Sequence, residues 1–215
     1  MASAFPPAVQ AEQYVILSGI SWKTYDCLLA DMADGHVAYV TYDQGMLEIR
    51  VPSFVHEQLN RLFHDLFTAI AVAMQIEFLH AGSTTFKRED VQRGFEPDTC
   101  FYVQHVEHVW GKTQLDLAVD SPPDVVIEID ITHASLNKLP IYAAVGVPEV
   151  WRYTGQALTI LTLAGETYHA QAASSALPGV ERHVLEQWLE AGQTTKRTEW
   201  LRRVQTWALT RCESS

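Results

Sequence analysis

The chain has 215 residues, a hydrophobic fraction of 47 % and a formal net charge of −11. This length favours one domain of ordinary size, and the absence of an apolar run of roughly 18 residues predicts a soluble protein without a membrane span. Proteins that grip nucleic acid mainly through phosphate contacts are usually basic, so the charge argues against that class.

The N-terminus does not carry the basic segment and apolar stretch that mark a secretory signal. The three cysteines, Cys27, Cys100 and Cys212, are far apart in the sequence, odd in number and match no zinc spacing. We therefore expect free thiols and a reducing, cytoplasmic location.

The first elements are a helix, a hairpin and a long helix. Ser21 is a good N-cap for a helix that extends to about Asp34. Residues 37–42 and 46–51 predict a hairpin around the turn 43–45. Ser53 is expected to begin the longest helix, which ends near Gln75, and its apolar stripe should face a sheet. This stripe consists of Val55, Leu59, Leu62, Phe63, Leu66, Ile70 and Ala73.

The same helix also carries a polar stripe. His56, Asn60 and His64 recur at four-residue spacing, which places them on one side of the helix. We expect this stripe to be exposed to solvent. His56, at the start of the helix, could nevertheless approach a metal site.

The rest of the chain predicts an α/β fold with a mixed central sheet flanked by helices. Strands are expected at residues 76–80, 84–88, 99–104, 123–131, 148–154, 158–163 and 167–170. A helix should start near Asn137, with Pro140 in its first turn, and end at Gly146. Two amphipathic helices cover about 181–210. The last has one apolar face, for which a core contact is favoured over a dimer contact. That face comprises Trp200, Leu201, Val204, Trp207 and Ala208.

Three carboxylates stand out in the middle of the chain. Asp98 closes the turn Glu96-Pro97-Asp98, and a period of two places Glu128 and Asp130 on one face of the later strand, with isoleucines on the other. Burying like charges together is costly, and Mg²⁺ or Mn²⁺ is a common way to offset the repulsion. Lys138 follows and could stabilise developing negative charge on a phosphate.

Each of these residues has a simpler interpretation. Asp98 could be a hydrogen-bonded turn residue, and Lys138 a solvated residue at a helix start. Asp130 is equally an additional ligand or a strand-end residue that meets solvent, whereas a half-buried strand glutamate such as Glu128 favours function. Structural roles are favoured for Glu96 and Asp124. A histidine pair at residues 105 and 108 could bind zinc only with a third ligand.

Residues 121–153 read SPPDVVIEIDITHASLNKLPIYAAVGVPEVWRY. This stretch closely resembles the signature of the Uma-type putative restriction endonuclease family, which belongs to the PD-(D/E)XK nuclease superfamily. The matching positions are the Pro-Asp at 123–124, Glu128, Lys138, the Tyr-Ala at 142–143 and the Gly-Val-Pro-Glu-Val-Trp at 146–151. Upstream, residues 94–98 resemble the family's Glu-Pro-Asp motif and residues 47–56 its entry from the hairpin into the helix. The resemblance covers roughly residues 20–190.

The resemblance implies a single domain with a restriction-endonuclease-like fold that cleaves DNA with Mg²⁺ or Mn²⁺. In such a site Asp98 and Glu128 bind the cation. Apart from the resemblance, we consider Asp130 as a further metal ligand and His56 and Glu96 as auxiliary residues. The superfamily's usual lysine position is occupied by Asp130, so Lys138 would supply the ammonium from the following helix.

Two alternatives to a DNA endonuclease remain open at this point. One is a catalytically inactive module that keeps the nuclease fold and binds protein or nucleic acid, which the negative charge favours. The other is a metal-dependent enzyme that acts on a smaller phosphorylated substrate. A homodimer is compatible with all three.

Overall fold

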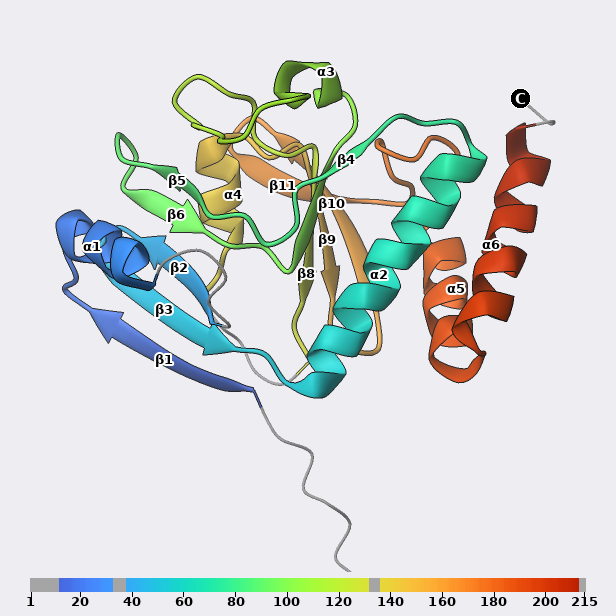
Figure 1. The fold of residues 1–215 in the computed structure, drawn as a ribbon, viewed down its shortest axis with the longest axis horizontal. Helices are drawn as coiled ribbons and strands as arrows, with labels where there is room; N and C mark the ends of the chain where they lie inside the picture. The colour runs from blue at the N-terminus through green and yellow to red at the C-terminus, as the bar shows by residue number, and fades with distance from the viewer. Residues whose placement is uncertain (1–11, 33–37, 132–135, 213–215) are drawn as a thin grey trace, which may run out of the picture.

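The computed structural model describes residues 12–32, 38–131 and 136–212. Within these ranges the chain forms six helices and eleven strands arranged in two sheets, which confirms the α/β class (Figure 1). The helices are α1 (Trp22–Met32), α2 (Phe54–Ala73), α3 (Val106–Val109), α4 (Leu139–Val145), α5 (Arg182–Thr194) and α6 (Arg197–Cys212).

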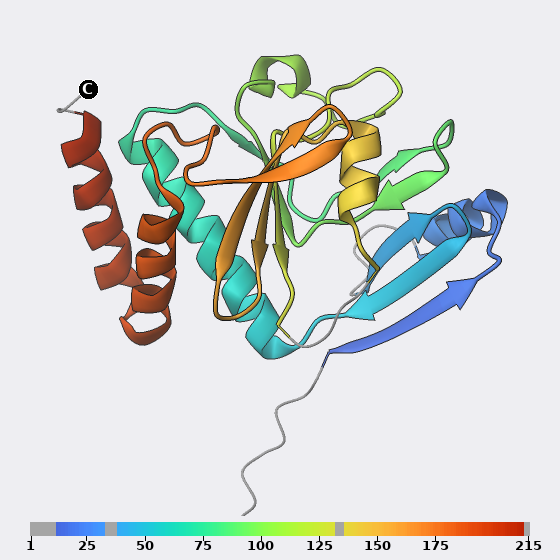
Figure 2. The ribbon, with the colours of Figure 1, turned by 180° about the vertical axis from the view of Figure 1, so that it is seen from behind.

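The central sheet is the predicted mixed sheet, and we call it sheet B. Its strand order is β11-β10-β9-β8-β7-β4, with β8 and β9 parallel and every other pair antiparallel. The strands are β4 (Leu79–His80), β7 (Thr99–Tyr102), β8 (Val125–Ile129), β9 (Glu149–Tyr153), β10 (Leu158–Ala164) and β11 (Thr167–Gln171). Helices α2, α5 and α6 lie on one side of this sheet and α4 on the other (Figures 1 and 2).

A second sheet, sheet A, is entirely antiparallel with the order β1-β3-β2-β6-β5. It lies with α1 on the α4 side of sheet B (Figure 1). Its strands are β1 (Gln13–Ser18), β2 (Tyr39–Asp43), β3 (Met46–Val51), β5 (Phe86–Arg88) and β6 (Arg93–Phe95). The sequence analysis missed β1 and β6. All six residues of β1 are exposed, so it has no alternation of burial, and β6 has only three residues with a central glycine.

The predicted helix starts are confirmed by their caps. The side chain of Ser53 accepts a hydrogen bond from the backbone N–H of His56, and that of Ser21 accepts one from Thr24. Pro140 lies in the first turn of α4, and Gly146 ends that helix in the left-handed conformation that glycine tolerates. The predicted ends at Asp34 and Val37 lie outside the described residues.

The apolar core occupies both faces of sheet B. One cluster joins α2, α5 and α6 to β8, β9 and β10, and a second joins α4 to β5, β6 and β7. The α6 face is part of the first cluster, because Trp200, Val204 and Ala208 are fully buried. Val55 was wrongly included in the buried stripe of α2, since it is 43 % exposed. Within the described residues, Cys27 and Cys100 are free thiols, and no helix is long and apolar enough to cross a bilayer.

Candidate active site

Sheet B brings Asp98, Glu128 and Lys138 into one buried cluster. Asp98 immediately precedes β7, which pairs with β8, and its Oδ2 accepts the backbone N–H of Ile129 at 2.8 Å. Lys138 caps α4 and reaches back to Glu128 on β8, with 2.6 Å between its Nζ and Oε2. The exposed fractions of Asp98, Glu128 and Lys138 are 2 %, 5 % and 6 %. Three residues that are distant in sequence therefore share one water-poor site.

Arg50 is a member of this site that the sequence analysis did not identify. It lies on β3 of sheet A, and its guanidinium donates to Oδ1 of Asp98. A second guanidinium nitrogen lies 2.8 Å from Nε2 of His56. The available signal was its place in the hairpin-to-helix entry, two residues before the proline that leads into α2. Arg50 thus connects the two sheets at Asp98.

The polar stripe of α2 is mostly buried, so its predicted exposure was wrong for two of its three residues. His56 is 0 % exposed and Asn60 is 3 % exposed. Nε2 of His56 lies 3.1 Å from Oδ2 of Asp98, and Nδ2 of Asn60 donates to the backbone carbonyl of Asp98 at 2.9 Å. His64 is partly buried, with its ring 4.4 Å from that of His80. The stripe faces inward because it fixes the side chain and the backbone of Asp98.

Glu128 has a second partner that the sequence analysis quoted only as part of a motif. The hydroxyl of Tyr142, on α4, donates to Oε1 of Glu128. Lys138 precedes the same helix, so α4 supplies contacts to both carboxylate oxygens. The ring of Tyr142 packs edge to face against Phe95 of β6 at 4.8 Å. Through Tyr142, this contact connects the position of Glu128 to sheet A.

The pKa values of the two central carboxyl groups move in opposite directions. Burial alone would raise the pKa of Asp98, but the charges of Arg50 and His56 outweigh burial and hold it well below its usual range. Burial raises the pKa of Glu128 despite the opposing charge of Lys138, and the nearby charge of Asp98 adds to the rise. Burial also raises the pKa of Tyr142, so its phenol remains a proton donor at neutral pH.

Asp130 lies beside the cluster and has a cation of its own. Its Oδ2 accepts from Nε of Arg152 at 2.6 Å. Asp130, Glu128 and Lys138 line a common cavity of about 220 Å³. The sequence analysis expected a bound metal to offset repulsion among the three carboxylates, but side chains already do so. The pairs are Asp98 with Arg50, Glu128 with Lys138 and Asp130 with Arg152.

The structure gives Glu96 and Asp124 buried structural contacts. Glu96 accepts the backbone N–H of Val40 at 2.8 Å and the hydroxyl of Thr85. Oδ2 of Asp124 accepts the backbone N–H groups of Val103 and His105, at 2.7 and 2.9 Å. Glu96 therefore ties its turn to sheet A, and Asp124 orders the loop that leads to α3.

The site contains two buried carboxylates that could serve as ligands of a divalent cation. Within the described residues no group of three or more His, Cys, Asp or Glu is arranged to hold a metal, which also leaves the histidines at 105 and 108 without a zinc site. Mg²⁺ is commonly held by one or two carboxylates, with water and phosphate oxygens completing its shell. Asp98 and Glu128 are two neighbouring carboxylates that could form such a pair.

Comparisons with known proteins identify a family and a similar fold. The Uma2 family model, described as "Putative restriction endonuclease", matches residues 22–196. Among solved structures, the fold is similar to that of a putative nuclease of the family DUF820 from Anabaena variabilis. The TM-score is 0.53 at 12 % identity, and the match covers 79 % of this chain and 99 % of the other. No curated protein matches the sequence.

Proposed function

The chain belongs to the Uma2 family of putative restriction endonucleases, and from this premise we propose that it is a Mg²⁺- or Mn²⁺-dependent endonuclease that hydrolyses phosphodiester bonds of DNA. The observation that carries the proposal is the convergence of Asp98, Glu128 and Lys138. Buried carboxylates next to a lysine, at a cavity, are costly for stability and typical of catalytic sites.

Asp98 and Glu128 would hold the cation, and Asp130 is a further ligand only after it separates from Arg152. When bound, the cation would polarise the scissile phosphate and facilitate the ionisation of water. Arg50, His56 and Asn60 keep Asp98 ionised and oriented. Asp98 is therefore a preorganised ligand in the metal-free protein.

The reaction is a hydrolysis in which a water oxygen forms a bond to phosphorus while one ester P–O bond breaks. The water loses a proton, and the departing oxygen gains one to become a hydroxyl. In our proposal the Lys138 ammonium stabilises the negative charge that develops on the phosphate oxygens. Tyr142 keeps its proton and holds Glu128 in place, so Lys138 can turn toward the phosphate without leaving that carboxylate unpaired.

A second candidate is a catalytically silent module that binds protein or nucleic acid. The observation in its favour is that each carboxylate already has a side-chain cation. A charge of −11 also opposes phosphate binding.

The deciding experiment is cleavage of supercoiled plasmid with Mn²⁺ at low salt. We expect weak nicking that falls steeply with added salt, because phosphate contacts are screened and the net charge is unfavourable. Lys138→Ala should lose roughly 100-fold or more, since the lysine acts mainly on transition-state charge. Lys112→Ala, which removes a surface ion pair with Asp120, is the matched control and should retain full activity. If purified, folded wild-type protein cleaves no DNA, the module becomes the better assignment.

A further inference from the structure

Strand β1 (Gln13–Ser18) forms an unprotected edge of sheet A. It pairs with β3 in an unbroken antiparallel register, and on its outer side Figures 1 and 2 show none of the described elements. An edge strand leaves a row of backbone N–H and C=O groups that can pair with another chain. Such edges are usually protected by a lysine, a proline or a β-bulge, and β1 (QYVILS) has none of these. The proposed chemistry gives this strand no role.

The side chains of β1 are apolar and exposed on both faces of the strand. Its four large residues are 39–47 % exposed, and they are Tyr14, Val15, Ile16 and Leu17. Val51 of β3, which lies opposite the start of β1, is 40 % exposed and extends the patch. These five make up almost half of the eleven large hydrophobic residues that are exposed in the described part of the chain. Exposed apolar residues that gather in one place mark an interaction site, whereas single ones need no explanation.

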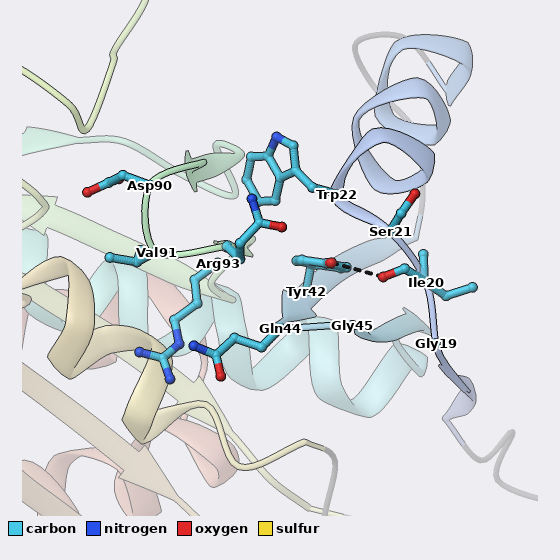
Figure 3. Close-up of a pocket in the computed structure, with 11 residues that line it drawn as sticks. Gly19, Ile20, Ser21, Trp22, Tyr42, Gln44, Gly45, Asp90, Val91 and Arg93 are labelled. Carbon is cyan, nitrogen blue, oxygen red and sulfur yellow. Dashed lines mark hydrogen bonds between the residues drawn. The ribbon is translucent and has the colours of Figure 1, made fainter.

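Contacts at both ends hold β1 in place before any partner arrives. Beyond its last residue, the hydroxyl of Tyr42 donates to the backbone carbonyl of Ile20 at 2.9 Å (Figure 3). Before its first residue, the carboxylate of Glu12 lies 3.5 Å from the guanidinium of Arg50 and 3.6 Å from the ring of His56. The strand between them is already extended. A partner that pairs with it would therefore lose little free energy to ordering of this edge.

The charges around β1 allow a second copy of this chain to approach. Two chains that each carry a net charge of −11 repel one another, unless they meet where neither presents acidic groups. β1 has no charged residue. The carboxylates beside it point inward: Glu12 contacts Arg50, and Glu48 of β3, which is 1 % exposed, accepts the backbone N–H of Leu136 at 2.8 Å. Contact between two copies at this edge therefore brings no like charges together.

The residue pattern of β1 suits pairing with a reversed copy of itself. Polar residues, Gln13 and Ser18, flank four apolar ones, so the pattern reads the same in both directions. A two-fold axis normal to the sheet makes the pairing antiparallel and places Val15 or Ile16 opposite its own copy. In either register the three central pairs are apolar, and Val15 lies within roughly 5–8 Å of its copy. The contact uses the same edge of both molecules, so it closes at two copies.

We propose that β1 of one molecule pairs antiparallel with β1 of a second copy, so that the two copies of sheet A form one continuous sheet of ten strands, five from each. The two β3 strands would then lie about 14 Å apart, three strand spacings. Because the axis is normal to the sheet, both candidate active sites would face the same side of it. The inference does not depend on DNA cleavage, since it rests only on the edge strand and the charges around it.

Sedimentation equilibrium of the full chain tests the proposal, at protein concentrations from about 1 to about 100 μM, the range in which micromolar complexes form. The wild type should dimerise. Val15→Lys should raise the dimer Kd at least about tenfold, because each copy loses an apolar contact and like charges meet across the axis. Leu209→Lys on α6 is the matched control, since Leu209 is also exposed, at 53 %, and it should keep the wild-type Kd. Circular dichroism checks that both variants fold.

A charge swap separates self-pairing at β1 from any other cause of dissociation. Val15→Glu alone should be as monomeric as Val15→Lys, but an equimolar mixture of the two should form a heterodimer with a Kd within about threefold of the wild type, because opposite charges then meet across the axis. A mixture that stays monomeric overturns the proposal. So does a dimer that survives in Val15→Lys, or an equal loss in Leu209→Lys. A wild type that is monomeric throughout also overturns it and leaves the edge to a different chain.

Discussion

The two faces of β8 are equally buried, but only one of them is entirely apolar. On one face Ile127 is 0 % exposed and packs in the apolar cluster with α2, α5 and α6. On the other face Glu128 is nearly as buried, yet it contacts an ammonium and a phenol. Neighbouring residues of one strand therefore contribute to the fold in different ways, Ile127 by apolar burial and Glu128 by buried ionic and hydrogen-bonded contacts.

The difference shows which face is maintained for stability. Apolar burial is favourable wherever shapes fit, at roughly 25 cal/mol per Å². A buried ion pair must first lose its hydration, and apolar residues of similar size often stabilise a fold as well or better. Asp98, Arg50, Glu128 and Lys138 are thus a poor choice for stability alone. Their presence on one face of β8 indicates a functional reason.

The largest effect should come from removing one member of a buried pair. Asp98→Ala leaves Arg50 and His56 buried with only the more distant carboxylate of Glu12, at 3.5 and 3.6 Å, as a counter-charge, and we expect a loss of about 3–5 kcal/mol in the free energy of unfolding. The double variant Arg50→Met/Asp98→Leu removes both charges and should lose clearly less than the single variant. Urea denaturation measures both. A single variant that costs under about 1 kcal/mol would show that water reaches this pair.

Adjacent substitutions on β8 should separate stability from activity. Ile127→Val removes one buried methylene and should cost about 0.5–1.5 kcal/mol while DNA cleavage stays at the wild-type rate. Glu128→Gln keeps the shape but removes the charge, and should reduce cleavage by roughly 100-fold or more. Plasmid nicking and urea denaturation of the two proteins provide the comparison. Equal activity losses would contradict the division between the two faces.

The sequence predicted the apolar contacts well, because apolar residues recur along a helix or strand with a period that can be counted. The stripe of α2, the alternation in β8 and the caps at Ser21 and Ser53 are local signals. Sheet A was harder to predict. Its strand β1 is exposed, and it pairs with β3 through backbone bonds that leave no pattern in side-chain type.

The buried charged and polar contacts of the candidate active site were predicted only in part. The motif pointed to Asp98, Glu128 and Lys138, which the structure brings together. It did not reveal Arg50, which comes from the other sheet, because the contact depends on how the two sheets meet. The stripe of His56 and Asn60 was assigned to solvent because polar residues are usually exposed, and the prediction failed where Asp98 supplies a buried partner.

His80 lies beside the apolar core, so its protonation measures the cost of placing a positive charge there. Its ring lies 5.3 Å from that of Phe101, and burial with the nearby charges of His64 and Arg61 lowers its pKa from 6.5 to about 4. A group whose pKa is depressed in the folded state contributes stability above its unfolded pKa and loses it on acidification. We expect this loss between pH 6.5 and pH 4, of roughly 1–2 kcal/mol once solvent screening is discounted.

Thermal unfolding of the wild type and His80→Gln at several pH values isolates this contribution. The variant should lose less stability than the wild type as the pH falls from 6.5 to 4. The difference between the proteins matters, because His56 contributes with the opposite sign: burial would lower its pKa, but the charge of Asp98 raises it. Parallel pH profiles of the two proteins would refute the role of His80.

The smallest effect concerns the cation itself. Mg²⁺ or Mn²⁺ should raise the melting temperature, because a ligand that binds only the folded state stabilises it by about 1.4 kcal/mol at ten times its Kd. The rise should be modest, since the cation competes with Lys138 and Arg50 for carboxylates that are already paired. Glu128→Gln should abolish this rise in melting temperature.

Asp130→Asn tests whether Asp130 is a third ligand. If the rise in melting temperature is unchanged, Asp130 stays paired with Arg152; if the rise is lost, Asp130 is a ligand. A midpoint that stays constant at millimolar metal in the wild type would count against a cation site on this face of β8.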